Sequence, residues 1–119
     1  METEAAIELA ILKHLNARED CLAFKYGVKA RQGKGRSYTS NGVSDIVVNL
    51  QIAEMCFVIY MEVKNKKGLQ RPSQFEFQKS IEALSGYYYI VRSVDEAEAA
   101  LKDAKGMIES MIQIAQIPW

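Results

Sequence analysis

Two charged side chains, Glu62 and Lys64, stand two positions apart in an otherwise apolar run over 56–64. This run predicts a strand, and because side chains alternate along a strand, both would point to one face, with Cα atoms roughly 6.5–7 Å apart. Burying a carboxylate and an ammonium is costly unless the two pair with each other or hold a ligand. The pair therefore indicates either an internal salt bridge or part of a reactive site.

A second carboxylate, Asp45, opens the preceding β-rich run over 45–52. If the two strands are neighbours in one sheet, Asp45 and Glu62 converge and form a hard-oxygen site suited to Mg²⁺. Lys64 beside that ion could orient a water or neutralise charge developing on a phosphate. The alternative is a Glu62–Lys64 salt bridge with Asp45 as an ordinary first residue of a strand.

Three further polar residues lie on faces expected to meet the core. Glu4 and Glu8, four apart in a predicted helix over 4–16, fall near its apolar stripe, although glutamates in a first turn also favour the helix dipole and can simply face water. Gln74 lies in the first turn of a later predicted helix, on its apolar side. It could donate to a water or a phosphate oxygen near Lys64, or be an ordinary polar residue at a helix start.

The charges of the chain are segregated although its net charge is zero. Residues 1–24 carry a net charge of −3, residues 25–71 of +6 and residues 72–119 of −3. Two acid-free basic clusters, over 25–36 and 64–71, lie on either side of the central carboxylates. They predict a surface that meets a polyanion, with solvated loop charge as the alternative. The neutral total argues against non-specific coating of DNA.

Length and composition exclude several classes of protein. The 119 residues suit a single domain over 1–119, and no apolar run approaches the roughly 20 residues of a membrane span. The acidic N-terminus does not resemble a signal peptide, and two cysteines with one histidine argue against a disulfide scaffold or a zinc site. Gly33 and Gly35 do not open a helix after a strand, so no nucleotide-cofactor motif is present. We expect a cytoplasmic protein without a small-molecule cofactor.

Helix and strand signals alternate along the chain and predict an α/β fold with a central sheet covered by helices on both faces. The expected elements are a helix over 4–16, a strand over 22–29, a basic loop or hairpin over 30–42, strands over 45–52 and 56–64, a helix from about 72, a strand over 87–92, a helix over 93–104 and a last helix over 107–116. The two middle strands are apolar enough to be buried on both faces.

Local signals mark the helix ends. Ser73 with Glu76, and Ser93 with Glu96, have the spacing of a capping box. Phe77, Ile81 and Leu84 continue the apolar face of the first of these helices, and Gly86 fits its stop. A glycine at position 106 predicts a break before the last helix, which is rich in methionine and isoleucine.

Four segments together resemble the VRR-NUC family of the PD-(D/E)xK nuclease superfamily. They are Gly42-Val43-Ser44-Asp45-Ile46-Val47-Val48, Tyr60-Met61-Glu62-Val63-Lys64, Gly68-Leu69-x-x-Pro72-Ser73-Gln74-x-x-Phe77 and Gly86-Tyr87-Tyr88-Tyr89-Ile90-Val91-Arg92-Ser93-Val94. The resemblance covers about residues 3–101, and the order and spacing of the segments are more specific than the carboxylate pattern alone. It implies a restriction-endonuclease-like core over about 3–104, a central mixed sheet flanked by helices, with an extra C-terminal helix over 105–119.

The resemblance assigns roles to the residues singled out above. Asp45 matches the metal-binding acid at the start of the second core strand, Glu62 and Lys64 match the Glu-x-Lys motif, and the Val63 carbonyl completes the metal shell. Gln74 matches the glutamine that follows the motif. The first-helix acid matches Glu4 or Glu8, and the spacing to Ile7 favours Glu4. Ser44 stands where many members have proline, which stiffens the turn but does no chemistry.

The implied activity is that of a Mg²⁺- or Mn²⁺-dependent endonuclease that selects branched DNA, such as four-way junctions, by shape. The resemblance is to small stand-alone phage and bacterial nucleases that act as homodimers on branched DNA, so we expect a homodimer here, and symmetric cutting of a four-way junction needs two sites. The apolar tail could seal that dimer or complete the monomer core. The cations expected along the sugar-phosphate backbone are Lys25, Lys29, Arg31, Lys34, Arg36, Lys66, Lys67 and Arg71. The alternatives are a catalytically inactive DNA-binding accessory protein and a flap or nicking nuclease.

Overall fold

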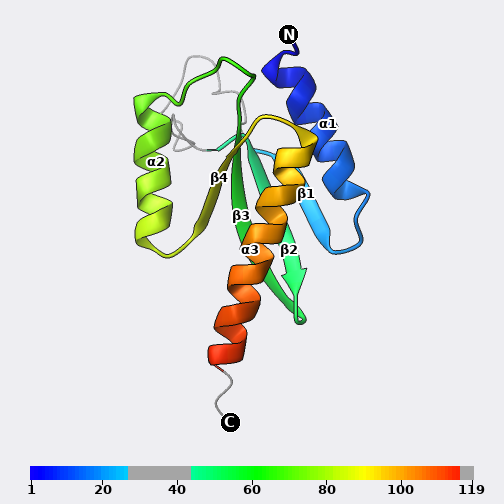
Figure 1. The fold of residues 1–119 in the computed structure, drawn as a ribbon, viewed down its shortest axis with the longest axis vertical. Coiled ribbons are helices and arrows are strands. Elements are labelled where there is room, and N and C mark those ends of the chain that lie inside the picture. The colour runs from blue at the N-terminus through cyan, green and yellow to red at the C-terminus, as the bar shows by residue number, and fades with distance from the viewer. Residues whose placement is uncertain (27–43, 116–119) are drawn as a thin grey trace, which may run out of the picture.

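A four-stranded mixed sheet forms the centre of the protein. The computed structural model describes residues 1–26 and 44–115 (Figure 1). Within them the elements are α1 (Glu4–Asn16), β1 (Cys21–Lys25), β2 (Ile46–Ile52), β3 (Met55–Val63), α2 (Pro72–Ala83), β4 (Tyr87–Val91) and α3 (Val94–Ile114). The strands lie in chain order, with β1–β2 and β2–β3 antiparallel and β3–β4 parallel. This is the expected α/β architecture with a mixed sheet flanked by helices.

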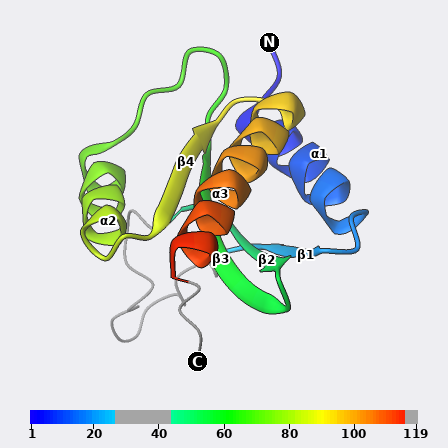
Figure 2. The same cartoon turned by 60° about the horizontal axis from the view of Figure 1, so that its bottom comes forward.

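The main core lies between one face of the sheet and two helices, α1 and α3, which Figure 2 shows over the same side of the strands. Ile11 and Leu15 of α1 and Leu101 and Ile108 of α3 are almost completely buried against the inward-facing residues of the strands. Their helical spacing is the reason these segments form amphipathic helices. Burying each such side chain contributes roughly 1.5–3 kcal/mol.

The opposite face of the sheet is covered by α2 only beside β3 and β4. The Phe77 ring of α2 packs edge-on against Tyr60, with centroids 5.3 Å apart, and lies 6.1 Å from the Tyr88 ring. Strand alternation and the sheet register place Tyr60, Glu62 and Tyr88 on this same face. The helix therefore lies on the side of the sheet to which Glu62 points.

The other half of that face is apolar, and none of the described helices covers it. Leu22 and Phe24 of β1 and Val58 of β3 are exposed there. The expectation that both middle strands are buried on both faces is confirmed for most of β2 but wrong for the first half of β3. The physical reason is that α2 packs mainly against β4, so no described helix covers Val58.

Helix α1 begins and ends as its sequence predicts. Thr3 is the N-cap, and its hydroxyl oxygen accepts a hydrogen bond from the amide of Ala6. Strand β1 ends at Lys25, and the remainder of the predicted strand, with the predicted basic loop over 30–42, lies outside the described residues. None of the helices described in residues 1–26 and 44–115 is long and apolar enough to span a membrane.

Helix α2 begins at Pro72, as predicted, but its predicted cap is wrong. Ser73 and Glu76 do not form a capping box, because the N-cap is Arg71 and Ser73 is already the second helical residue. Proline is favoured at a first helical position, since its missing N–H would be unpaired there in any case. This start places Gln74 at the third helical position, where its side-chain oxygen accepts a hydrogen bond from the Arg71 amide.

The end of α2 also corrects one expectation. The helix ends at Ala83, and the predicted apolar-face residue Leu84 is exposed. The chain then turns through Ser85, whose φ is 60°, to Gly86, whose amide donates to the carbonyl of Ile81. A Cβ at position 86 would lie 2.6 Å from the Ile81 side chain, so this close approach accounts for the glycine that marks the stop.

The predicted break at Gly106 is wrong, because α3 runs unbroken over Val94–Ile114. A glycine inside a helix costs only about 1 kcal/mol relative to alanine. Burial of Ala104 and Ile108 on either side of it outweighs that cost. The expected separate C-terminal helix is therefore the second half of α3. In this half Ile108 completes the core, whereas Met107 and Met111 are exposed.

Candidate active site

The two predicted carboxylates face each other across neighbouring strands. Ile46 of β2 pairs with Met61 of β3, so Asp45, one residue earlier, lies opposite Glu62. Residues directly opposite in an antiparallel pair share a face. Asp45 is also held in place, because its Oδ2 accepts a 2.8 Å hydrogen bond from the Val63 amide and its carbonyl accepts one from the Tyr26 amide. The predicted convergence of these two residues is confirmed.

Glu62 is a buried carboxyl with one free oxygen. Its side chain is 1% exposed, and its Oε2 accepts a 2.5 Å hydrogen bond from Gln74 Nε2. Its Oε1 finds no donor in the part of the chain that the structure describes. Burial and the neighbouring Asp45 raise the pKa of Glu62 to about 8, and Lys64 and Arg71 oppose that rise. An unpaired buried oxygen costs free energy, so a cation or a donor is favoured at this position.

Lys64 brings a buried ammonium to the same place. Its side chain is 7% exposed, and its Nζ lies 3.7 Å from Glu62 Oε2. The backbone of Lys64 is fixed by a hydrogen bond from its amide to the carbonyl of Val91 in β4. The predicted shared face of Glu62 and Lys64 is thus confirmed. The ion pair alone does not satisfy Glu62, because it engages only one of the two carboxylate oxygens.

Gln74 joins the start of α2 to Glu62. Because the Arg71 amide can only donate, the side-chain atom that it meets is the oxygen of Gln74, and the amide nitrogen must therefore face Glu62. The sequence predicts Gln74 beside the site, and the structure places it there. The Gln74 side-chain amide, however, donates its hydrogen bond to Glu62, whereas the expected acceptor was a water or a phosphate oxygen.

Both first-helix glutamates lie beside the site. Oε2 of Glu4 accepts a 3.4 Å hydrogen bond from the amide of Asn65, the residue after Lys64. Glu8 is mostly buried and pairs with Lys25 at 3.2 Å. Burial raises the pKa of Glu8, and Asp45 and Glu4 add to the rise while Lys25 opposes it. The contacts place Glu4 beside the Lys64 end of the site and Glu8 beside its Asp45 end.

The carboxylates around the site do not form a complete protein cage for a metal. Within residues 1–26 and 44–115, no group of three or more Asp, Glu, His or Cys side chains is close enough together to hold an ion. Mg²⁺ in proteins is often bound by only one or two carboxylates, with waters and substrate phosphate oxygens completing its octahedron. Asp45 and Glu62, with the free Oε1, fit that mode of binding. The family resemblance implied a fuller ligand set, with Glu4 or Glu8 as a third carboxylate.

The predicted DNA-contacting cations divide into three groups. Lys66, Lys67 and Arg71 are exposed in the connection between β3 and α2, directly after the site. Lys25 lies at the end of β1 and is paired with Glu8. The other four, which are Lys29, Arg31, Lys34 and Arg36, lie outside the described residues.

One residue beside the site was missed by sequence reasoning. Arg92, directly after β4, donates from Nη1 to the carbonyls of Asn65 at 2.6 Å and of Gly68 at 2.9 Å. It therefore fixes the loop that follows Lys64. The only local signal was an arginine at the end of the predicted strand over 87–92, because the pairing of β3 with β4 was not predicted.

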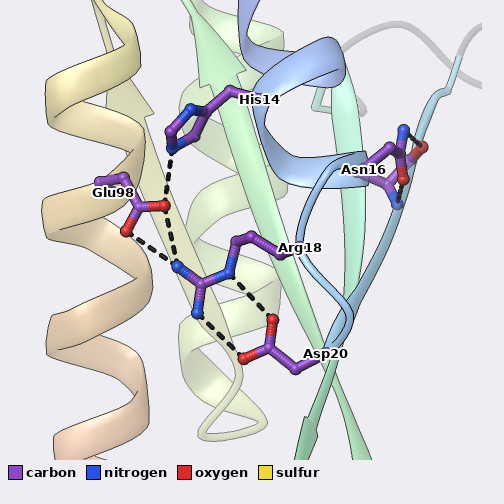
Figure 3. Close-up of polar contacts among 6 residues, drawn as sticks. His14, Asn16, Arg18, Asp20 and Glu98 are labelled. Atoms are coloured by element: carbon purple, nitrogen blue, oxygen red, sulfur yellow. Dashed lines mark hydrogen bonds and ion pairs between the residues drawn. The ribbon is translucent and has the colours of Figure 1, made fainter.

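A second polar cluster lies away from the site, between α1, the turn after it and α3 (Figure 3). Arg18 donates to both carboxylate oxygens of Asp20 and to both of Glu98, and His14 Nε2 lies 2.7 Å from Glu98 Oε1. We call these four residues the clamp cluster. His14 thus contacts α3 through Glu98.

Comparison with models of known families and with curated proteins finds no match for this chain. The assignment of roles to the site residues accordingly comes from their geometry and from the motif resemblance.

Proposed function

We propose that the protein is a metal-dependent phosphodiesterase that acts on DNA. The observation that carries this proposal is the meeting of Asp45 and Glu62 across β2 and β3. Glu62 Oε1 has no hydrogen-bond partner among residues 1–26 and 44–115, and Lys64 Nζ lies 3.7 Å from Oε2. A structural salt bridge would explain Glu62 and Lys64 but not a second carboxylate beside them. Two carboxylates held together are disfavoured unless a cation neutralises them.

Asp45 and Glu62 would hold Mg²⁺ or Mn²⁺, with the Val63 carbonyl as a further ligand and with water or substrate phosphate oxygens completing the shell. Because no third carboxylate among the described residues groups with these two, Glu4 and Glu8 are left out of this ligand set. When bound, the ion supplies Lewis-acid stabilisation of the negative charge that develops on the phosphate. Gln74 holds the Glu62 carboxylate in a single orientation, and the Val63 amide does the same for Asp45. Fixed ligand orientation matters because small errors in position are costly in catalysis.

Lys64 is the residue that would position the attacking water. In hydrolysis the water oxygen forms a bond to phosphorus, one ester P–O bond breaks, and the leaving sugar oxygen takes up a proton. An ammonium donates hydrogen bonds and stabilises charge but cannot accept a proton. Lys64 therefore orients the water and offsets the negative charge on the phosphate, in a buried setting where electrostatic effects are strong.

Branched DNA is the substrate that we propose, and four-way junctions are the first to test. Exposed Lys66, Lys67 and Arg71 beside the site suit contact with phosphates, which fix the position of DNA without reading its sequence. Because such contacts do not read bases, we expect the protein to select its DNA substrate by shape. The family resemblance supports the same substrate class.

A homodimer is part of the proposal, since two sites are needed to cut a symmetric junction. Two exposed apolar groups support it, one made of Leu22, Phe24 and Val58 on the sheet, the other of Met107 and Met111 on α3. The molar mass of Phe24→Glu and of Met111→Glu, measured by light scattering, would show which of the two apolar groups forms the dimer interface. The variant that becomes monomeric identifies the interface, and two variants that match a dimeric wild type exclude both groups.

The decisive experiment is a substrate panel with the wild-type protein. A four-way junction, a flap, a splayed arm and a linear duplex are each incubated with Mg²⁺, Mn²⁺ or a chelator. Cleavage that requires the metal and Asp45 supports the proposal. DNA binding without cleavage in any metal would instead identify a non-catalytic accessory protein, and cleavage of the flap alone would identify a flap nuclease.

A further inference from the structure

The connection between β3 and α2 is held rigidly in its first half. Arg92 donates to the carbonyls of Asn65 and Gly68, the Gly68 amide donates to the Asn65 carbonyl, and the Lys67 amide donates to Asn65 Oδ1. A Cβ at position 68 would lie 2.7 Å from Oε2 of Glu4, so the loop also packs closely on α1. These bonds fix a surface segment that directly follows Lys64.

The second half of the connection is fixed as well. Gln70 Nε2 donates to Gln78 Oε1 in α2 and to the Tyr88 hydroxyl in β4. The Arg71 amide then donates to Gln74, which caps α2. Position 69 therefore lies between Gly68, whose backbone is hydrogen-bonded, and Gln70, whose side chain is anchored.

On this anchored loop a large apolar side chain is turned into solvent. Leu69 is 81% exposed, and Phe75, one turn into α2, is 49% exposed. Lys79 Nζ lies 5.2 Å from the centroid of the Phe75 ring. The stretch over 63–75 contains no acidic residue, and its cations Lys66, Lys67 and Arg71, which lie within a few positions of Leu69 in the sequence, are exposed. No contact among the described residues buries Leu69, so covering its side chain with a ligand would remove apolar surface from water.

We infer that Leu69 and Phe75, which we call the wedge pair, contact the exposed base faces at the branch point of DNA bound to the site. This inference rests on the proposed function. The neighbouring cations match phosphates, but an apolar side chain gains little from the sugar-phosphate backbone. It gains from a base whose stacking is interrupted, as apolar and aromatic residues do where they insert between bases or stack on single strands. A linear duplex exposes such faces only at its ends, so the wedge pair would supply selectivity for branches.

The test compares binding of a fluorescein-labelled four-way junction with binding of a linear duplex of the same total length, measured by anisotropy in chelator. Leu69→Ala and Phe75→Ala are each expected to weaken junction binding by roughly fivefold or more, the effect of losing one stacking contact. Both should leave duplex binding within about twofold of wild type. Lys67→Ala should weaken the two equally, because its contacts are to phosphates.

Leu84→Ala is the matched control, since Leu84 is equally exposed, at 80%, but lies at the far end of α2. It should change neither affinity. A 2-aminopurine at the branch should change its fluorescence on binding wild type and not on binding Leu69→Ala. The inference is overturned if the wedge variants weaken both DNAs equally or neither, or if wild type does not prefer the junction.

Cleavage with Mg²⁺ in the same preparations separates this inference from the proposed function. If the wedge variants lose junction preference but wild type cleaves nothing, the surface is correct and the nuclease proposal fails. If wild type cleaves the junction and the wedge variants bind it normally, the nuclease proposal holds and the wedge pair is refuted.

Discussion

Two polar clusters in this protein use the same side-chain types in opposite ways. In the clamp cluster every oxygen of Asp20 and Glu98 accepts a hydrogen bond from Arg18, and this arginine holds the pKa of both carboxyls below their usual range. At the site, Glu62 faces a second acid, leaves one oxygen unpartnered among the described residues and has a pKa raised to about 8. In the clamp cluster each carboxylate is neutralised by an arginine, whereas at the site two acids are brought together.

The difference indicates what each cluster is for. Complementary ion pairs that join α1 to α3 stabilise the folded state and need no further partner. Two acids held together in a buried place destabilise the folded state, and such an arrangement is typical of sites that bind a ligand. A substitution of Glu62 should therefore lower activity and raise metal-free stability. A substitution in the clamp cluster should lower stability and leave activity unchanged.

The largest effect expected is on cleavage. Asp45→Ala or Lys64→Ala should lower the rate of junction cleavage in Mg²⁺ by at least roughly 10³, because each removes a metal ligand or the charge that positions water. Binding to the junction should be largely retained. Glu98→Gln is the control, and it should keep the wild-type rate within about twofold. A wild-type rate in either site variant would refute the assignment.

The second effect is on stability as a function of pH. The unperturbed pKa of Glu62 is 4.5 and the folded value is about 8, so between these values the folded state holds a proton that the unfolded chain has released. Metal-free stability should therefore fall as pH rises through this window, and Mg²⁺ should restore it at pH 8.

Glu62→Gln tests the same comparison without metal. It retains a group that accepts from Gln74 but cannot ionise, so above pH 8 the metal-free variant should melt at a higher temperature than wild type while being inactive. Thermal melts at several pH values with and without Mg²⁺ measure both. A wild-type protein whose stability rises from pH 5 to 8, with Glu62→Gln following it, would contradict the raised pKa.

A smaller effect is expected at the clamp cluster. Arg18→Ala removes the partner of Asp20 and Glu98 and should lower the free energy of unfolding by about 1–2 kcal/mol, a value reduced by the partial exposure of the three side chains. Denaturant unfolding measures this loss. The rate of DNA cleavage by the folded variant should stay at the wild-type value, and a loss of activity would show that the two clusters are coupled.

The smallest effect is expected at His14. Its pair with Glu98 is well exposed, so His14→Asn should lower the free energy of unfolding by no more than about 0.5 kcal/mol. The same denaturant experiment detects it. A loss as large as that of Arg18→Ala would mean that His14 contributes as much as Arg18 to the stability that the clamp cluster provides.

The centre of the site could be predicted from the sequence because it depends on local periodicity. Glu62 and Lys64 share a face by strand alternation, and Asp45 meets them once consecutive strands pair, the commonest arrangement in sheets. The fold class followed from the same alternation of strand and helix signals. These inferences needed no information about contacts between distant segments.

What failed depended on competition between local signals and packing. Ser73 is a good capping residue, but Pro72 sets the helix start before it and thereby changes what Gln74 can bond. Gly106 is typical of a helix end, yet α3 continues past it because Ile108, in the following turn, is buried in the core. Arg92 acts across the parallel pairing of β3 and β4, and no local pattern links it to the loop that it holds.

One amide group has a consequence for how the site assembles. Gln74 closes the first turn of α2 and aims Glu62 with the same side chain, so formation of that turn and preparation of the acid are one event. When the N-terminal turn of α2 frays, the carboxyl loses its orientation at the same moment. Amide hydrogen exchange in this turn should therefore follow the fraction of molecules competent for reaction, and heat should inactivate the protein before it unfolds the sheet.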